Sequence, residues 1–306
     1  MILCSGEALI DMLPRTTSDG ENAFAPHAGG AVFNTAIALG RLGVSTGFWC
    51  GLSRDMFGQQ LQQALTASGV DFSLAPISDR PTTLAFVSLV SGQAQYAFYD
   101  ENTAAREVTV DDLPTLDSRV EALFFGGISL VSEPCGQVLA DFMVREAPHR
   151  VTMLDPNIRT GFIRDEAVYR QRIDTLIEAS DIVKLSDEDA DWLFGKADAV
   201  THGRALLEAG VTLAVITEGA KGATAFTARH QVSVAAPQVT VVDTVGAGDT
   251  FNAGLLDGLN TLQALDKQRL AELTPEALEQ ALGRAVQIAA VTVSRAGANP
   301  PWQREL

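Results

Sequence analysis

Short apolar runs alternate with helix-like patterns along most of the chain. Runs at residues 120–125, 151–154, 182–185 and 213–216 have the length and composition of buried strands. Buried strands that alternate with helices favour a mostly parallel sheet covered by helices. The sequence therefore predicts an α/β fold. Residues 2–10 are expected to add one further strand.

Two segments depart from this alternation, at about residues 12–28 and 82–100. Apolar and other residues alternate there with polar turns, as in residues 84–98, and Ser91-Gly92-Gln93 has the composition of a hairpin turn. This pattern predicts short strands outside the parallel sheet. No internal repeat, low-complexity tract or interdomain linker is evident, so residues 1–306 are expected to form one main domain.

Composition and charge exclude several classes of partner. The 306 residues are 46% hydrophobic, enough for one large core or two smaller domains, and carry a formal net charge of −16. Nucleic acids and anionic membranes require a basic surface, so neither is expected as a partner. No apolar stretch reaches the roughly 18 residues of a membrane span, and the N-terminus lacks the basic flank of a secretory signal.

The cysteines point to a reducing compartment. Cys4, Cys50 and Cys135 are odd in number and far apart, and none of them belongs to a CxxC pair. This spacing is typical neither of a disulfide framework nor of a zinc site. A cytoplasmic location is therefore expected.

A glycine-rich turn with two carboxylates carries the most specific chemistry. Residues 243–251 read Asp-Thr-Val-Gly-Ala-Gly-Asp-Thr-Phe and follow residues 239–242, which we expect to form a strand. Gly246 and Gly248 permit a tight turn whose N–H groups face an anion at the start of the next helix. Asp249 adds a negative charge there, which suits a base that accepts a proton from an alcohol about to be phosphorylated. The alternative is that Asp249 only caps this helix.

These nine residues resemble the C-terminal signature of the PfkB (ribokinase-like) sugar kinases, DTxGAGDxF. Residues 29–36, Gly-Gly-Ala-Val-Phe-Asn-Thr-Ala, resemble the N-terminal signature of the same family. The resemblance covers essentially the whole chain and implies a ribokinase-like three-layer sandwich with a small β lid, formed here by residues 12–28 and 82–100. It also implies an ATP-dependent kinase that uses Mg²⁺. Asp249 would then be the catalytic base and would contact the substrate, and the amides of Gly246, Ala247 and Gly248 would stabilise the transferred phosphoryl group.

The resemblance also implies a sugar site built from several elements. The residues expected to contact the sugar, besides Asp249, are Asp11, Gly29, Gly30, Asn34, Phe98 and Arg159, the last in the DPNxR segment at 155–159. Three of them have an alternative role: Asp11 could be a surface aspartate, Phe98 could only pack the lid, and Arg159 could only neutralise neighbouring carboxylates.

Further segments resemble the family's ATP and cation sites. Residues 217–222 resemble a TxGxxG turn that contacts ATP phosphates, and residues 186–189 replace the family's NxxE pattern with Ser186 and Asp189. Asp189 is expected to hold Mg²⁺ through water, and the carbonyls of Asp243 and Val245 to hold K⁺. The residues expected to bind the nucleotide are Lys184, Ser186, Thr217, Gly219, Gly222, Gly246, Gly248 and Asn299.

Within the family, the opening residues 4–14 and the DPNxR segment look most like those of bacterial fructokinases. A 2-keto-3-deoxygluconate kinase is the main alternative, but residues 96–105 contain two acidic residues and no arginine, which favours a neutral sugar. Arg106 lies just beyond this stretch, so the choice between these two kinases stays open. A nucleoside kinase and a non-catalytic sugar sensor are further alternatives. We expect phosphorylation of D-fructose at O6, with the sugar and ATP as partners and a homodimer that pairs through the lid.

Overall fold

A large, mostly parallel β-sheet forms the centre of the computed structural model, which describes residues 1–90 and 93–306. In this part of the chain the strand order is β14-β13-β12-β11-β10-β9-β1-β4. The strands from β4 to β12 in this order run parallel, and β13 and β14 are antiparallel additions at one edge. The strands are β1 (Ile2–Ser5), β4 (Thr46–Trp49), β9 (Ala122–Gly126), β10 (Val151–Asp155), β11 (Ile182–Ser186), β12 (Leu213–Thr217), β13 (Ala223–Phe226) and β14 (Gln231–Val234). The four strands predicted between residues 120 and 216 are thus confirmed.

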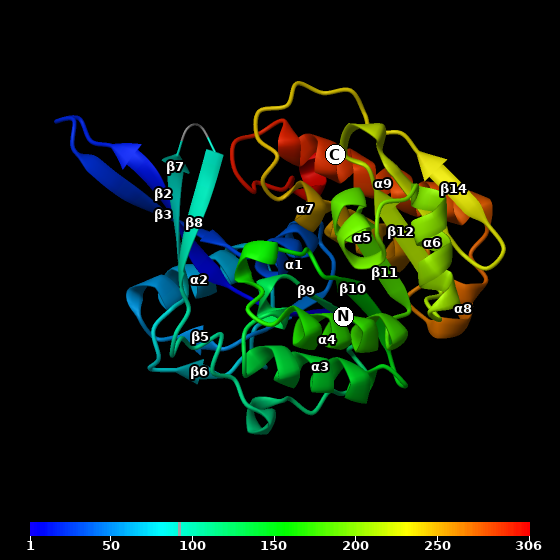
Figure 1. Ribbon diagram of the computed structural model, residues 1–306, viewed down its shortest axis with the longest axis horizontal. Helices are drawn as coiled ribbons and strands as arrows, with labels where there is room; N and C mark the ends of the chain where they lie inside the picture. The colour runs from blue at the N-terminus through cyan, green and yellow to red at the C-terminus, as the bar shows by residue number, and fades with distance from the viewer. Residues whose placement is uncertain (91–92) are drawn as a thin grey trace.

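Helices cover both faces of this sheet, as a three-layer sandwich requires (Figure 1). The helices packed on one face are α1 (Ala31–Arg41), α2 (Met56–Ala67), α7 (Ala247–Thr261), α8 (Lys267–Ala271) and α9 (Pro275–Val293). Those on the other face are α3 (Cys135–Glu146), α4 (Glu166–Glu178), α5 (Asp187–Phe194) and α6 (Ala199–Glu208). Among the described residues, none of these helices combines the length and apolarity needed to cross a bilayer.

A second, smaller sheet stands beside the large one (Figure 1). Its order is β3-β2-β7-β8, with β2 (Leu9–Thr16), β3 (Asn22–Gly29), β7 (Leu84–Val90) and β8 (Gln93–Tyr99). The register aligns Asp11 with Ala85 and Ala85 with Phe98 across neighbouring strands, so these residues share one face. The hairpin turn expected at residues 91–93 falls largely on residues 91 and 92, which lie outside the described residues. A short parallel pair, β5 (Leu52–Ser53) and β6 (Ile77–Ser78), completes the strands of the described chain.

Two strand predictions are wrong. Residues 2–10 are not one strand, because the chain leaves the large sheet after Ser5 and enters the small sheet at Leu9. At Gly6, where it turns, an added Cβ would lie 2.5 Å from Cγ2 of Val32, so the turn packs tightly on α1. The second error is at residues 239–242, which form no strand. There the amide of Val242 donates to the carbonyl of Val293 at the end of α9, although the β-branched composition resembles that of a strand.

Candidate active site

One cleft of about 1350 Å³ opens at the carboxyl ends of the parallel strands. In open α/β sheets, ligands usually bind at this edge, because loops from several strands converge there. The small sheet lines one end of the cleft, which we call the small-sheet end. The loops after β11 and β12 line the other, which we call the β12 end.

The start of α7 lies between these two ends. Gly246 precedes the helix with φ 78°, a left-handed conformation that suits glycine, and the helix begins at Ala247 as the glycine-rich turn predicted. The amides of Gly246, Gly248 and Asp249 donate no hydrogen bond within the described residues, whereas that of Ala247 is 3.3 Å from the carbonyl of Thr244. Free amides at a helix start form a site for an anion.

Asp249 lies in the first turn of α7 and is only 7% exposed. It does not cap the helix, because Gly246 occupies the N-cap position and no side chain accepts a capping hydrogen bond there. Instead, Oδ2 accepts a hydrogen bond from Nδ2 of Asn34 at 2.9 Å, and Oδ1 is 3.5 Å from Nδ2 of Asn157. The capping alternative is therefore wrong, and the carboxylate faces the cleft.

Burial raises the pKa of the Asp249 carboxyl from 3.8 to about 7. The bond from Asn34 acts in the opposite direction, while the negative charges of Asp155 and Glu7 add to the rise and Lys184 offsets part of it. A carboxylate with a pKa near neutrality can both take up and release a proton under physiological conditions, which suits it to act as a general base.

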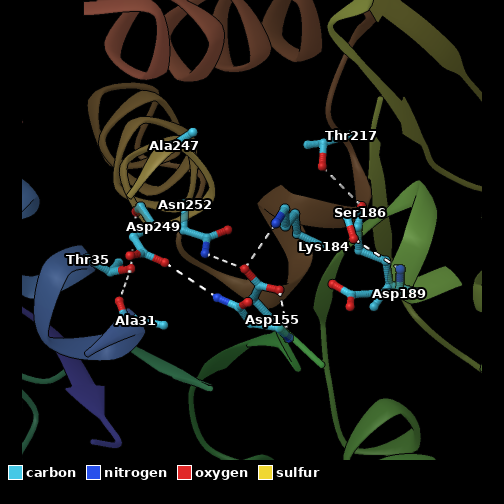
Figure 2. A network of polar contacts seen from close by, with 12 residues as sticks. Ala31, Thr35, Asp155, Lys184, Ser186, Asp189, Thr217, Ala247, Asp249 and Asn252 are labelled. Atoms are coloured by element: carbon cyan, nitrogen blue, oxygen red, sulfur yellow. Dashed lines mark hydrogen bonds and ion pairs between the residues drawn. The ribbon is translucent and has the colours of Figure 1, made fainter. Parts of the chain in front are cut away.

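A buried ion pair lies beside this first turn (Figure 2). Nζ of Lys184 is 3.1 Å from Oδ2 of Asp155, and the same oxygen accepts a hydrogen bond from Nδ2 of Asn252 at 2.7 Å. Asp155 is 1% exposed, so its charge depends on these two partners and on the amide of Asn157, which donates to Oδ1 at 3.2 Å. A Cβ added to Gly248 would lie 3.4 Å from Nζ of Lys184, which brings the ammonium group next to the helix start.

At the small-sheet end, Asp11 is half-buried and lines the cleft. Burial raises its pKa to about 6. A Cβ on Gly29 would lie 2.3 Å from its Oδ2, so only glycine leaves room for the carboxylate there. Gly30, Asn34 and Phe98 also line this end, whereas Gly29 lies behind Asp11 and does not. The ring of Phe98 packs edge-on against Phe162, with centroids 4.4 Å apart.

The structure distinguishes Arg159 from Arg106, whose roles the sequence left open. Arg159 lines the cleft, and its guanidinium donates to the carbonyl of Ile158 at 3.0 Å. Within the described residues it forms no ion pair with a carboxylate, so no contact supports the neutralising alternative, and its role in substrate binding stays a prediction. Arg106 does not line the cleft, because it forms an ion pair with Asp100 at 3.1 Å and donates to the carbonyl of Glu133.

At the β12 end, Ser186 and Asp189 both line the cleft but also hold local structure. Oγ of Ser186 accepts the amide of Asp189 at 3.0 Å and so caps α5. Oδ1 of Asp189 accepts the amide of Ile158 at 3.0 Å, and burial, aided by the charge of Asp155, raises its pKa. The remaining residues predicted for this region that line the cleft are Thr217, Gly219 and Gly222.

The loop before α7 is tied to the C-terminal loop. Oδ2 of Asp243 accepts the amide of Gly297 at 2.9 Å, and Oδ1 accepts the amide of Val245 at 3.0 Å. The carbonyls of Asp243 and Val245 accept no hydrogen bond within the described residues. Asn299 does not line the cleft, and its Oδ1 accepts a bond from Arg41 at 2.9 Å.

An apolar wall completes the β12 end. It consists of small and β-branched side chains from the loop after β14 and from α9, namely Ala236, Val239, Val241, Val286, Ala289 and Val293. Such a surface suits the flat face of an aromatic ring.

Reasoning from the sequence missed three residues of the polar network. Asp155 and Asn157 follow β10 in the same segment as Arg159, and that segment was the available signal. Asn252 stands just after the glycine-rich motif, in a stretch of small and apolar residues that gave no signal for it. Glu7, which is buried and also lines the cleft, was missed as well.

Comparison with known proteins agrees with this geometry. The family described as pfkB family carbohydrate kinase matches residues 1–305. A fructokinase of Rhizobium leguminosarum bv. trifolii is 54% identical over 278 residues, which are 91% of this chain and 85% of that protein. The structure of a fructokinase from Xylella fastidiosa with bound ATP is 30% identical, with a TM-score of 0.88 over 97% of this chain and 93% of that one. A double mutant of a fructokinase from Vibrio cholerae O395, bound to fructose, ADP and a potassium ion, is 25% identical, with a TM-score of 0.84 over 97% and 93% of the two chains.

Proposed function

The chain belongs to the pfkB family of carbohydrate kinases, and we propose that it transfers the γ-phosphate of ATP to the O6 hydroxyl of D-fructose. The enzyme is a phosphotransferase with an alcohol acceptor. The observation that carries the proposal is the position of Asp249, a buried carboxylate with a raised pKa in the same helical turn as free N–H groups. A base and an anion site in one turn are what phosphoryl transfer to an alcohol requires.

In the proposed reaction, the sugar binds at the small-sheet end and ATP at the β12 end. Asp249 accepts the proton of the hydroxyl while its oxygen attacks the γ-phosphorus in line and the bond to ADP breaks. The amides of Gly246 and Gly248, with the ammonium of Lys184, stabilise the charge on the phosphoryl group. Asp11 and Asn34 orient the sugar hydroxyls, and the small sheet acts as a lid that excludes water.

The nucleotide would bind along the β12 end. Thr217, Gly219 and Gly222 would face the phosphates, and the adenine ring would rest on the apolar wall. Asn299 would help to enclose this region from the C-terminal loop, where Arg41 holds its side chain. Relatives with bound ATP or ADP support this use of the cleft.

We propose Mg²⁺ as the metal that accompanies ATP. Within the described residues, no group of three or more His, Cys, Asp or Glu side chains gathers to hold a metal alone. This fits an ion whose ligands are mostly phosphate and water. Asp189 would contact its water shell through Oδ2, because Oδ1 is bonded to Ile158. When bound, Mg²⁺ would neutralise phosphate charge.

We also propose a K⁺ site at the carbonyls of Asp243 and Val245. Both carbonyls accept no hydrogen bond within the described residues, so they remain free as ligands. Asp243 fixes this loop through its bonds to Val245 and Gly297. The Vibrio cholerae fructokinase with a bound potassium ion supports a cation in a protein of this fold.

The charges at the small-sheet end favour a neutral sugar over a sugar acid. A carboxylate substrate would need a cation there, but Arg106 is already paired with Asp100 and lies outside the cleft. Lys184 lies beside Gly248 at the start of α7, where the phosphoryl group is proposed to bind, and not at the small-sheet end. Among the described residues that line the cleft, Arg159 is the cation that remains for the carboxylate of 2-keto-3-deoxygluconate.

A coupled assay of ADP release tests the proposed function. MgATP would be supplied with fructose, 2-keto-3-deoxygluconate, ribose, tagatose or adenosine, with and without K⁺, and the phosphorylated carbon identified by NMR. We expect the highest kcat/KM for fructose, product at O6 and a higher rate with K⁺. Preference for the keto-deoxy acid would overturn the substrate but keep the reaction class, and no turnover would favour a non-catalytic sensor.

Activity should fall at acid pH, because Asp249 must be ionised to accept a proton. With a pKa raised by burial to about 7, kcat/KM for the sugar should fall about tenfold for each pH unit below that value. The charged groups facing Asp249 are Glu7, Asp155 and Lys184. Protonation of Asp11, whose pKa burial raises to about 6, should add a rise in the sugar KM. Rates measured from about pH 5 to 9 check this, and a flat profile would contradict it.

We further propose a homodimer that pairs through the small sheet, and a cytoplasmic location. Phe24 and Tyr99 lie on the outermost strands of that sheet and are 46% and 62% exposed. Light scattering should give twice the mass of one chain, and a monomer mass would contradict the dimer. Three free, buried cysteines and the use of ATP support a reducing, ATP-rich compartment, which the distribution of the protein between cell fractions would test.

A further inference from the structure

Glu7 is a buried carboxylate at the small-sheet end that has no part in the reaction described above. It lies between β1 and β2, where the chain leaves the large sheet for the small one, and it is 5% exposed. Glutamate is rarely buried to this extent without partners, because desolvation of its charge is costly. Its contacts therefore indicate its role.

The carboxylate of Glu7 joins two separate walls of the cleft. Oε1 accepts the amide of Ala31, the first residue of α1, at 2.8 Å. Oε2 accepts the amide of Ser129 at 3.2 Å, in the short helical turn Ile128–Leu130 that follows β9. Amides at the start of a helical segment lack partners within it, and a carboxylate stabilises them. One side chain thus fixes the distance between the two segments.

Two glycines make room for the backbone and the side chain of Glu7. Gly30 has φ 114°, and a Cβ there would lie 2.8 Å from the carbonyl oxygen of Glu7. Gly127 has φ 72°, and a Cβ there would lie 2.2 Å from Oε1. Both glycines line the cleft. The backbone on both sides is therefore shaped around Glu7.

From Ala31 the contacts continue to Asp249 through the first turn of α1 (Figure 2). Oγ1 of Thr35 donates to the carbonyl of Ala31 at 3.0 Å and lies 3.1 Å from the carbonyl of Asp249. Nδ2 of Asn34 donates to Oδ2 of Asp249 at 2.9 Å. The turn that Glu7 holds thus contacts both the backbone and the carboxylate of the proposed base.

Capping alone would not require this residue. Ser, Thr or Asn can satisfy a helix start without a charge, and a second buried carboxylate near Asp249 raises the free energy of the folded state. A locally unfavourable choice of this kind is typical of functional sites. The carboxylate of Glu7 is a single rigid group that binds both walls of the cleft, and this offsets its cost.

We propose that Glu7 is a positioning residue for phosphoryl transfer, which holds the Gly30–Ala31 turn and the Gly127–Ser129 turn so that the acceptor hydroxyl meets Asp249. This proposal rests on the kinase function proposed above. Small displacements of a bound hydroxyl lower the rate strongly, because the reacting atoms must be aligned.

The variant Glu7→Gln tests this role. Its amide group would direct a second N–H at Ala31 or Ser129, and one of the two contacts would break. We expect the KM for fructose to rise and kcat to fall, each by about tenfold, while the KM for ATP stays unchanged. Hydrogen exchange should also speed up at the start of α1 or at residues 127–130, and this readout does not depend on activity.

Two further variants separate positioning from loss of stability. Asp181→Asn is the control, because Oδ2 of Asp181 accepts a hydrogen bond from the amide of Thr152 at 2.9 Å and pairs with Lys267 at 2.5 Å, at the opposite end of β11 from the cleft. It should lower stability without altering either KM. In Glu7→Gln combined with Asn34→Ala, the loss of kcat should be smaller than the product of the two single losses, because both act through α1.

The outcomes distinguish this proposal from the function on which it rests. Wild-type values of the fructose KM and kcat in Glu7→Gln, or an equal rise of both KM values, would overturn the role of Glu7 and leave the kinase function standing. If the unaltered protein phosphorylates no sugar, the function fails and the positioning role fails with it.

Discussion

The variant Asp249→Asn should lower kcat for fructose phosphorylation by about 10²–10⁴-fold, the range expected when a general base is lost. Asparagine matches the shape of aspartate and can still accept the bond from Asn34, but it cannot take up the proton of the hydroxyl. The KM values should change little, because the walls of the cleft remain in place. The coupled ADP assay measures this directly.

The stability of this variant provides an internal control, because its free energy of unfolding should stay the same or rise while its kcat falls. The pKa of Asp249 is higher in the folded protein, about 7, than its unperturbed value of 3.8. Its protonated form is therefore favoured by folding, and this contribution to stability is lost as pH rises from about 4 through 7. At pH 8, Asp249→Asn should be as stable as the wild type or more so, by up to about 4 kcal/mol.

Asp257→Asn is the matched control for Asp249→Asn. Asp257 lies on the same helix and is also 7% exposed, but it pairs with Arg284 away from the cleft. Its variant should keep wild-type turnover and lose stability. Near-normal turnover in a folded Asp249→Asn protein would remove Asp249 from the role of base.

The variant Lys184→Met should reduce both stability and turnover. It leaves Asp155 as a buried charge bonded to Asn252 but without a cation, a loss of about 3–5 kcal/mol in the free energy of unfolding. It also removes a positive charge beside the amide of Gly248, which should lower kcat about 10²-fold or more. Chemical denaturation and the coupled assay measure the two effects separately.

A double variant tells these two effects apart. Adding Asp155→Asn to Lys184→Met removes the uncompensated charge, so stability should recover in part while turnover stays low. Arg284→Met is the control, because it breaks the partly buried pair with Asp257 at 2.8 Å outside the cleft and should lower stability only. Recovery of turnover in the double variant would show that Lys184 serves the fold and not the phosphoryl group.

The sequence predicted those parts of the structure that depend on local pattern. The strands between residues 120 and 216 are apolar runs, and the turn at Gly246 has a second glycine two residues later, so each was recognisable within a few residues. The break between Ser5 and Leu9 was not recognisable, because apolar residues continue through it while the chain changes sheets. Residues 239–242 have the composition of a strand, but their polar backbone contact is with the end of α9.

The polar network could not be predicted, because its members are distant in sequence. Asn34 and Asp249 are 215 residues apart, Asp155 and Asn252 are 97 apart, and Glu7 and Ser129 are 122 apart. A side chain that bonds to a distant partner leaves no periodic signal at either position. The motif predicted Asp249 as the base, but the groups that raise its pKa became evident only in the folded chain.

Helix α1, near the N-terminus, contacts two segments near the C-terminus, and this has a consequence for synthesis of the protein on the ribosome. Its first turn binds Asp249, and Arg41 at its last turn donates to the carbonyl of Pro300 at 2.9 Å. The N-terminal helix is therefore made long before the partners that complete its contacts. If Asp249 is the base, as proposed, a nascent chain shorter than residue 249 lacks it, and catalytic competence would arise only once most of the polypeptide has been made.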